Sequence, residues 1–308
     1  MPLISNQLRG TLLVALSGML YGIVGYCGTM LFREHFSVPA MLFWRFSIAT
    51  IWVGVSCLSQ RKKLLIHAHR YKGLGKAVLF SSVFYSGASA FYFLATEHHI
   101  GTGVAMVIFF SFPVFVTLFA WVLSEWKINE ATFASLIMVI IGLILLKDHG
   151  SNALNIVGVL LGVIAAISYA CYVYNSQHTT YIIDTRLLTL LICASNSAIF
   201  FLLMIYTHTF TVPTTITAWA NVLAIGIIAT ALPIQLLLDG LKFISSVKAS
   251  ILSVLEPVMV VVVGLAFLGE SISSMQVIGI ITVLTGAILI QFERPPETQT
   301  PSQHNILN

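Results

Sequence analysis

Ten stretches of apolar residues, each about twenty residues long, constrain this chain more than any other feature. A helix needs about 20 apolar residues to cross the hydrocarbon core of a membrane. The backbone groups inside lipid must be satisfied within the segment, which favours helices over open strands. The sequence therefore predicts an all-α, polytopic membrane protein with ten transmembrane helices, at 10–31, 39–59, 74–96, 101–123, 130–147, 155–176, 185–206, 219–241, 246–268 and 273–292.

The composition excludes a soluble fold. Charged residues make up 8% and hydrophobic residues 58% of the chain, whereas a soluble domain carries about a quarter charged residues. Membrane lipid is therefore the expected surrounding of most of the surface. The net charge of +4 is small and the basic residues gather in one loop, so no nucleic-acid partner is expected. The four cysteines lie in apolar stretches without metal-like spacing, which indicates buried, reduced thiols.

Lysine and arginine set the expected orientation. The loop between the second and third stretches is basic, and such loops stay in the cytoplasm. If this loop is cytoplasmic and the chain crosses the membrane ten times, both termini lie on the cytoplasmic side of the cell (inner or plasma) membrane. The polar run 293–308 has little to bury and is predicted to be a disordered cytoplasmic tail. The basic residues of the loop are Arg61, Lys62, Lys63, Arg70, Lys72 and Lys76.

An internal repeat divides the chain into two halves. A shift of 144 positions lays Pro113 on Pro257 and Gly142 on Gly286. This predicts a first five-helix repeat at 1–150 and a second at 151–292. Because each half has an odd number of spans, the halves must lie in opposite orientations. Inverted repeats of this kind are typical of secondary transporters, whose site lies near the midplane.

Two ionisable residues lie at membrane depth, where a charge is costly and indicates function. Glu256 precedes Pro257, which opens the helix, so its carboxylate is a candidate for binding a cation or a proton. Alternatively it makes a structural hydrogen bond that holds the broken helix. Arg45 is able to hold a carboxylate or phosphate through two parallel bonds. Alternatively its stem extends to the outer headgroups, as the interfacial character of Trp44 suggests.

Polar side chains within the spans complete the candidate site. Gln235 and Asp239 lie one turn apart, and Asp239 alternatively pairs with Lys242 or Lys248. Buried tyrosines are expected to line a cavity and stack on a planar substrate, or to satisfy one another. The tyrosines in question are Tyr21, Tyr92, Tyr169 and Tyr172, and the predicted substrate-binding set is Glu256, Arg45, Tyr21, Tyr92, Tyr169 and Gln235.

Motifs for catalysis are missing from the sequence. It contains no H-E-x-x-H, no G-x-S-x-G and no phosphate-binding P-loop. We therefore expect no enzyme activity, no cofactor and no metal site.

Several motifs resemble one family. Glu256-Pro257-Val258 is followed by Gly269-Glu270 and Gly286, the first half carries Phe112-Pro113-Val114 and Gly142, and Arg45 lies in Phe43-Trp44-Arg45-Phe46. This pattern resembles the EamA-type members of the drug/metabolite transporter superfamily. Glu125 departs from it, being one position out of register with Glu270.

The resemblance implies ten helices, cytoplasmic termini and a cavity lined mainly by spans one, three, four, six, eight and nine. It also implies alternating access for small metabolites, often amino acids or their relatives and commonly as export. The prediction is a secondary active transporter of a small polar or amphipathic metabolite, compatible with a homodimer. A channel or a lipid-flipping protein of similar architecture is the alternative.

Overall fold

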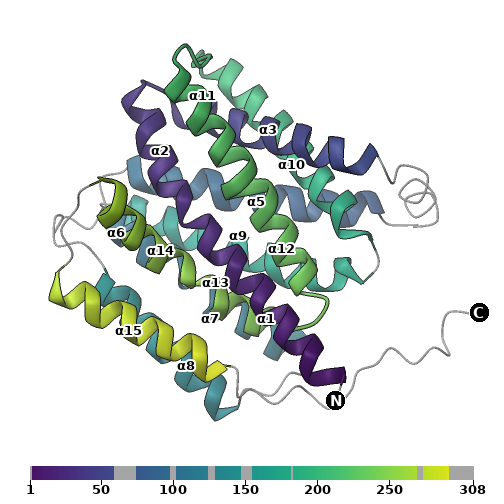
Figure 1. Ribbon diagram of the computed structural model, residues 1–308, viewed down its shortest axis with the longest axis vertical. Helices are drawn as coiled ribbons and strands as arrows, with labels where there is room; N and C mark the ends of the chain where they lie inside the picture. The colour runs from purple at the N-terminus through teal and green to yellow at the C-terminus, as the bar shows by residue number, and fades with distance from the viewer. Residues whose placement is uncertain are drawn as a thin grey trace, which may run out of the picture.

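The computed structural model describes residues 2–58, 74–97, 102–123, 129–146, 155–181, 183–268 and 273–290. Within these ranges the protein is helical and has no strand (Figure 1). The first half contains α1 (Pro2–Tyr21), α2 (Ile23–Arg33), α3 (Val38–Leu58), α5 (Leu74–Glu97), α6 (Thr102–Phe109), α7 (Phe112–Leu123) and α8 (Glu130–Leu146). The second half contains α9 (Ile156–Thr180), α10 (Thr185–Tyr206), α11 (Ile216–Leu223), η1 (Ala224–Ala231), α12 (Leu232–Gly240), α13 (Ser246–Ser253), α14 (Leu255–Val263), η2 (Gly264–Leu268) and α15 (Ser274–Leu289).

The helices confirm a multi-pass membrane protein. Eight helical segments of the described chain are long and apolar enough to cross a membrane, and their apolar side chains cover much of the outside. The apolar helices α8 and α15 are shorter, and they occupy the fifth and tenth predicted stretches. The basic residues at 61–72 and the predicted disordered tail, 293–308, lie outside the described residues.

Two predicted spans are broken near their middle by proline. The fourth span turns at Phe110 and Ser111, between α6 and α7, and the ninth turns at Val254, between α13 and α14. Pro113 and Pro257 follow these turns and lack the N–H that would continue the helix. Phe110 and Val254 are 144 positions apart, which is the offset of the sequence repeat.

The first span is interrupted at Gly22, between α1 and α2. A side chain there would collide with Met259 and would lie 3.1 Å from the Glu256 carbonyl oxygen. Glycine therefore allows the first span to pack directly against the broken ninth span, beside the candidate Glu256.

The helices pack in pairs (Figure 1). α3 lies beside α10 and α8 beside α15, and these two pairs occupy opposite edges of the molecule. Between them, α1 packs on α12 and α5 on α9. The α8–α15 pair is antiparallel, because Gly142 lies against Val283 while Leu146 lies against Gly279.

Candidate functional site

A cavity of about 410 Å³ lies within the helix bundle. Its walls come from α1, α2, α3, α5, α6, α8, α9, α14, η2 and α15, so both halves of the chain contribute. The prediction that Glu256, Arg45, Tyr21, Tyr92 and Tyr169 share one site matches this geometry, since all five line the cavity. Other lining residues are Tyr26, Thr29, Phe32, Tyr85, Ser89, Phe93, Thr96, Phe109, Phe110 and Gln276.

Arg45 and Glu256 place one basic and one acidic side chain on the cavity wall. Arg45 is only 6% exposed and lines the cavity, so it is enclosed by the helix bundle. Trp44 lies near the start of α3, and its indole Nε1 donates a hydrogen bond to the Thr211 carbonyl oxygen at 2.8 Å. Glu256 lies in the first turn of α14. Its carboxylate makes no hydrogen bond or ion pair with the residues that the structure describes.

Nine of the 25 residues that line the cavity are aromatic. Tyr169 packs edge-on against Phe112 at a centroid distance of 4.6 Å, and Phe109 contacts both Tyr92 and Tyr169. Such rings offer flat apolar surfaces with polar edges, which suit an amphipathic ligand.

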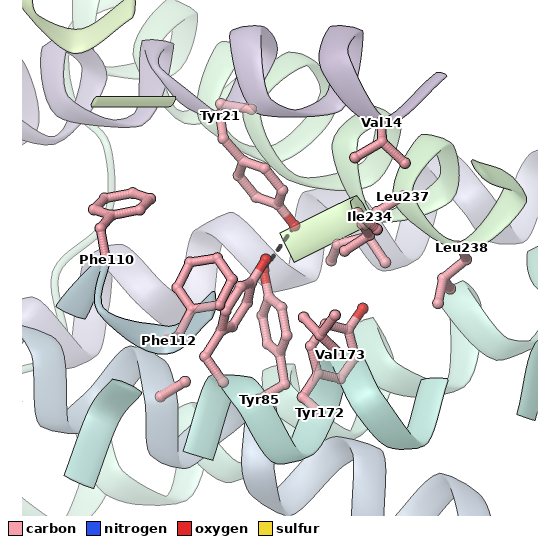
Figure 2. Packing of buried hydrophobic residues seen from close by; sticks show 14 of the residues in the cluster. Val14, Tyr21, Tyr85, Phe110, Phe112, Tyr172, Val173, Ile234, Leu237 and Leu238 are labelled. Carbon is pink, nitrogen blue, oxygen red and sulfur yellow. Dashed lines mark hydrogen bonds between the residues drawn. The ribbon is translucent and has the colours of Figure 1, made fainter. Parts of the chain in front are cut away.

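Tyr85 is a lining residue that the sequence analysis did not select. Its hydroxyl lies 3.1 Å from that of Tyr21, and the two rings point toward one another from α5 and α1 (Figure 2). Helical spacing was the available signal: Tyr85, Ser89, Tyr92 and Thr96 follow at intervals of four, three and four residues, and therefore share one face of α5.

Beyond the Tyr21–Tyr85 pair, the bundle is filled by apolar side chains (Figure 2). Val14 of α1, Ile234 and Leu237 of α12, and Val173 of α9 are completely buried there. Tyr172 is also buried in this region and does not line the cavity, and its hydroxyl contacts the Ser176 hydroxyl without good hydrogen-bond geometry. The cavity is thus closed toward the end of the bundle where α1 begins.

The opposite end of the cavity lies near the ends of helices. Phe32 is the penultimate residue of α2, Thr96 that of α5, Leu146 the last residue of α8, and Gln276 belongs to the first turn of α15. The cavity therefore extends from the middle of the bundle toward the end where α2 finishes.

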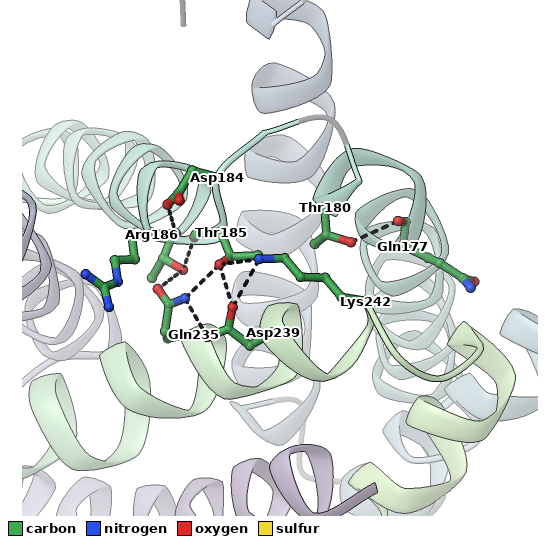
Figure 3. A network of polar contacts seen from close by, with 9 residues as sticks. Gln177, Thr180, Asp184, Thr185, Arg186, Gln235, Asp239 and Lys242 are labelled. Carbon is green, nitrogen blue, oxygen red and sulfur yellow. Dashed lines mark hydrogen bonds and ion pairs between the residues drawn. The ribbon is translucent and has the colours of Figure 1, made fainter. Parts of the chain in front are cut away.

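Gln235 lies elsewhere, in a polar network between α10 and α12 (Figure 3). Its amide nitrogen donates to Thr185 Oγ1 and to Asp239, both at 3.0 Å, and its amide oxygen accepts from Thr189 at 3.1 Å. Asp239 accepts from Thr185 at 2.6 Å and pairs with Lys242 at 3.4 Å, as the alternative interpretation of Asp239 proposed. Gln235 is consequently satisfied by protein groups and is not a lining residue of the cavity.

The eighth span, Ile216–Gly240, supplies no lining residue among those described, although the family resemblance implied that it would. It lies behind Arg45 instead. Arg45 Nε donates a hydrogen bond of 2.6 Å to Thr230 Oγ1, and Thr230 belongs to the π-helical segment η1.

Comparison with known proteins agrees with this architecture. The model of the EamA-like transporter family matches residues 8–147 and 156–292. An "Uncharacterized transporter YxxF" of Bacillus subtilis (strain 168) is 23% identical, over 95% of this chain and 93% of its own. An "Uncharacterized transporter" of Archaeoglobus fulgidus is 25% identical, over 66% of this chain and 74% of its own.

A solved structure titled "Crystal structure of protein" has the same fold. It superposes with a TM-score of 0.78 at 18% identity, over 91% of this chain and 95% of its own. Since the family model covers nearly the whole described membrane region, the chain is a member of the EamA-like transporter family.

Proposed function

We propose that the protein is a secondary active transporter that moves a small amphipathic zwitterion, such as an amino acid or a related compound, across the cell membrane by alternating access. One observation carries the proposal: a cavity of about 410 Å³ holds Arg45 and Glu256 among aromatic side chains. A carboxylate pairs with the guanidinium, an ammonium group pairs with Glu256, and the apolar part of the substrate contacts the rings.

Alternating access needs two halves able to exchange roles, and several contacts support an inverted repeat. The family model matches each half of the chain, and the turns at Phe110 and Val254 are related by the repeat offset. The helix pairs also respect the repeat. The α3–α10 pair and the α8–α15 pair each join two spans that are equivalent under the repeat. The repeat also converts the α1–α12 pair into the α5–α9 pair. These relations support ten spans, with α8 and α15 as the fifth and tenth.

The shape of the cavity supports an outward-facing state. With both termini in the cytoplasm, the last residues of α2, α5 and α8 and the first residues of α15 fall on the outer side. The buried apolar layer around Val14 and Leu237 then closes the cytoplasmic side. Among the described residues, this apolar layer fills the bundle on the cytoplasmic side of the cavity, which favours a transporter over an open channel.

The test is counterflow in proteoliposomes that contain the purified protein. Vesicles loaded with unlabelled L-phenylalanine, L-leucine, L-glutamate or L-lysine are placed in a trace of the same labelled compound. We expect saturable, transient accumulation of at least one neutral amino acid. Flux that rises linearly with concentration indicates a channel, movement of a fluorescent phospholipid between leaflets indicates a lipid-flipping protein, and a chemically altered product indicates an enzyme. Each of these results would overturn the proposal.

A further inference from the structure

We propose that Thr230, which does not touch the cavity, is the positioning residue that aims Arg45 at the carboxylate of the substrate. This inference rests on the proposed function, since it concerns the same cavity. It adds a residue from the eighth span, the span that contributes nothing to the cavity wall among the described residues.

The Thr230 hydroxyl donates one hydrogen bond and accepts another. Its hydroxyl donates to the Ile225 carbonyl at 2.7 Å, five residues earlier in the π-helical segment η1. A hydroxyl has one hydrogen, so its oxygen is left as an acceptor. Arg45 Nε–H, which is only a donor, fills that position at 2.6 Å.

The close approach of η1 to α3 depends on Gly226. A Cβ atom at Gly226 would lie 2.5 Å from Ile48 Cβ and 3.2 Å from the Arg45 carbonyl oxygen, so no larger residue fits. The π-helical segment precedes Pro233, whose missing N–H removes the regular helical bond to Ala229. Glycine and proline together therefore bring Thr230, which is fully buried, against the Arg45 side chain.

This arrangement decides which edge of the guanidinium faces the cavity. The bond to Thr230 occupies Nε, and the described structure records no other hydrogen bond from Arg45. Its two terminal nitrogens are not among the buried polar atoms that lack a partner, so they keep contact with open space. Arg45 is thereby prepared to hold a carboxylate end-on with its two terminal nitrogens, on a side chain that Thr230 keeps from rotating.

A first experiment requires no ligand. In protein labelled with ¹⁵N-arginine, the Nε–H signal that disappears in Arg45→Lys belongs to Arg45. We expect this hydrogen to exchange slowly with water in the wild type and in Thr230→Ser, and at least tenfold faster in Thr230→Val, which keeps the shape but loses the hydroxyl. Should the valine variant not fold, Thr230→Ala serves the same comparison. Equal exchange rates in the wild type and the hydroxyl-free variant would overturn the proposal.

A second experiment measures specificity, with L-phenylalanine and L-phenylalaninamide as probes of the aromatic-lined cavity. For Thr230→Val we expect about a tenfold higher KM for the acid with little change in maximal rate, and a smaller preference for the acid over the amide. Thr230→Ser should stay within about twofold of the wild type. Thr117→Val is the matched control, because the buried Thr117 hydroxyl donates only to the Pro113 carbonyl, in the same way that many helix threonines do.

The outcomes separate the two proposals. An unchanged ratio of acid to amide in Thr230→Val, with normal wild-type transport, removes the positioning role and leaves the transporter assignment intact. Faster Nε–H exchange in Thr230→Val, in a protein that transports no amino acid, supports the positioning of Arg45 and refutes the proposed substrate class.

Discussion

Gly142 and Val283 touch across the α8–α15 pair: a Cβ atom at Gly142 would lie 2.6 Å from Val283 Cγ2. The opposite contact repeats the relationship, since a Cβ atom at Gly286 would lie 3.2 Å from Val139 Cγ2. The repeat offset of 144 converts Gly142 into Gly286 and Val139 into Val283. The two contacts are therefore related by the offset of the sequence repeat, which supports the inverted repeat proposed above.

This close packing predicts that Gly142→Ala destabilises the protein. The added methyl group has no room beside Val283, and overpacking of this kind costs about 1–3 kcal/mol. Lower apparent melting temperature in a detergent thermal-unfolding assay is the expected result. Gly75→Ala is the control, because a Cβ atom at Gly75 meets nothing within 4 Å. Equal melting temperatures for the two variants would contradict the tight α8–α15 contact.

The proposed orientation predicts where introduced cysteines react. Single cysteines placed in the 61–76 loop and after Arg294 should both be labelled only by reagents that reach the cytoplasm. A cysteine-free background, with Cys27, Cys57, Cys171 and Cys193 replaced, provides the control. Labelling of the two positions from opposite sides of the membrane would rule out the ten-span arrangement.

Arg45→Lys should weaken transport of a substrate that carries a carboxylate. Lysine keeps the positive charge but cannot make two parallel hydrogen bonds. It also lacks the Nε donor that bonds Thr230. We expect KM in counterflow to rise about tenfold, which corresponds to about 1.4 kcal/mol. Normal transport by the lysine variant would show that Arg45 is not the carboxylate ligand.

Removal of the Tyr85 hydroxyl should lower the stability of the protein more than removal of the Tyr172 hydroxyl does. Tyr85→Phe leaves the buried Tyr21 hydroxyl without its partner, which costs about 1–3 kcal/mol. Tyr172→Phe removes a buried hydroxyl whose contact with the Ser176 hydroxyl lacks good hydrogen-bond geometry, so the loss of stability should be small or absent. Thermal unfolding of both variants, with Tyr21→Phe/Tyr85→Phe as the paired control, makes the comparison. A larger loss in Tyr172→Phe than in Tyr85→Phe would contradict the recorded contacts.

Glu256→Gln tests whether the carboxylate couples transport to protons. Glutamine keeps the shape and hydrogen-bonding capacity of Glu256 but cannot exchange a proton. If Glu256 is the coupling group, the variant should still exchange substrate in counterflow but should no longer accumulate it when driven by a pH gradient. Counterflow serves as the internal control for folding. Undiminished accumulation driven by pH would assign coupling to another group.

The apolar stretches of the sequence were enough to predict the fold class. Lipid requires long apolar helices, so apolar stretches mark them in the sequence. Most ends of the described helices lie within a few residues of the predicted ends. Ionisable groups at membrane depth are costly and therefore rare, which is why Arg45 and Glu256 could be selected from sequence and then found on one cavity.

Hydropathy could not determine how each polar side chain is satisfied. Gln235 and Glu256 both lie within apolar spans, yet Gln235 bonds Thr185, Thr189 and Asp239, while Glu256 faces the cavity. Which of the two is open to a ligand depends on the rotation of each helix and on its neighbours. A one-dimensional pattern does not contain that information when lipid, cavity and core are all apolar.

The sequence by itself determined the helices, the repeat and the few charges in the membrane, because each follows from local chemistry in a single segment. Only the tertiary structure decided that Tyr85 meets Tyr21, that Gly226 brings η1 against α3, and that Thr230 accepts the Arg45 Nε–H. Arg45 and Thr230 are 185 residues apart in the chain. Their contact arises from packing between spans, where small residues allow close approach and no local signal marks the partner.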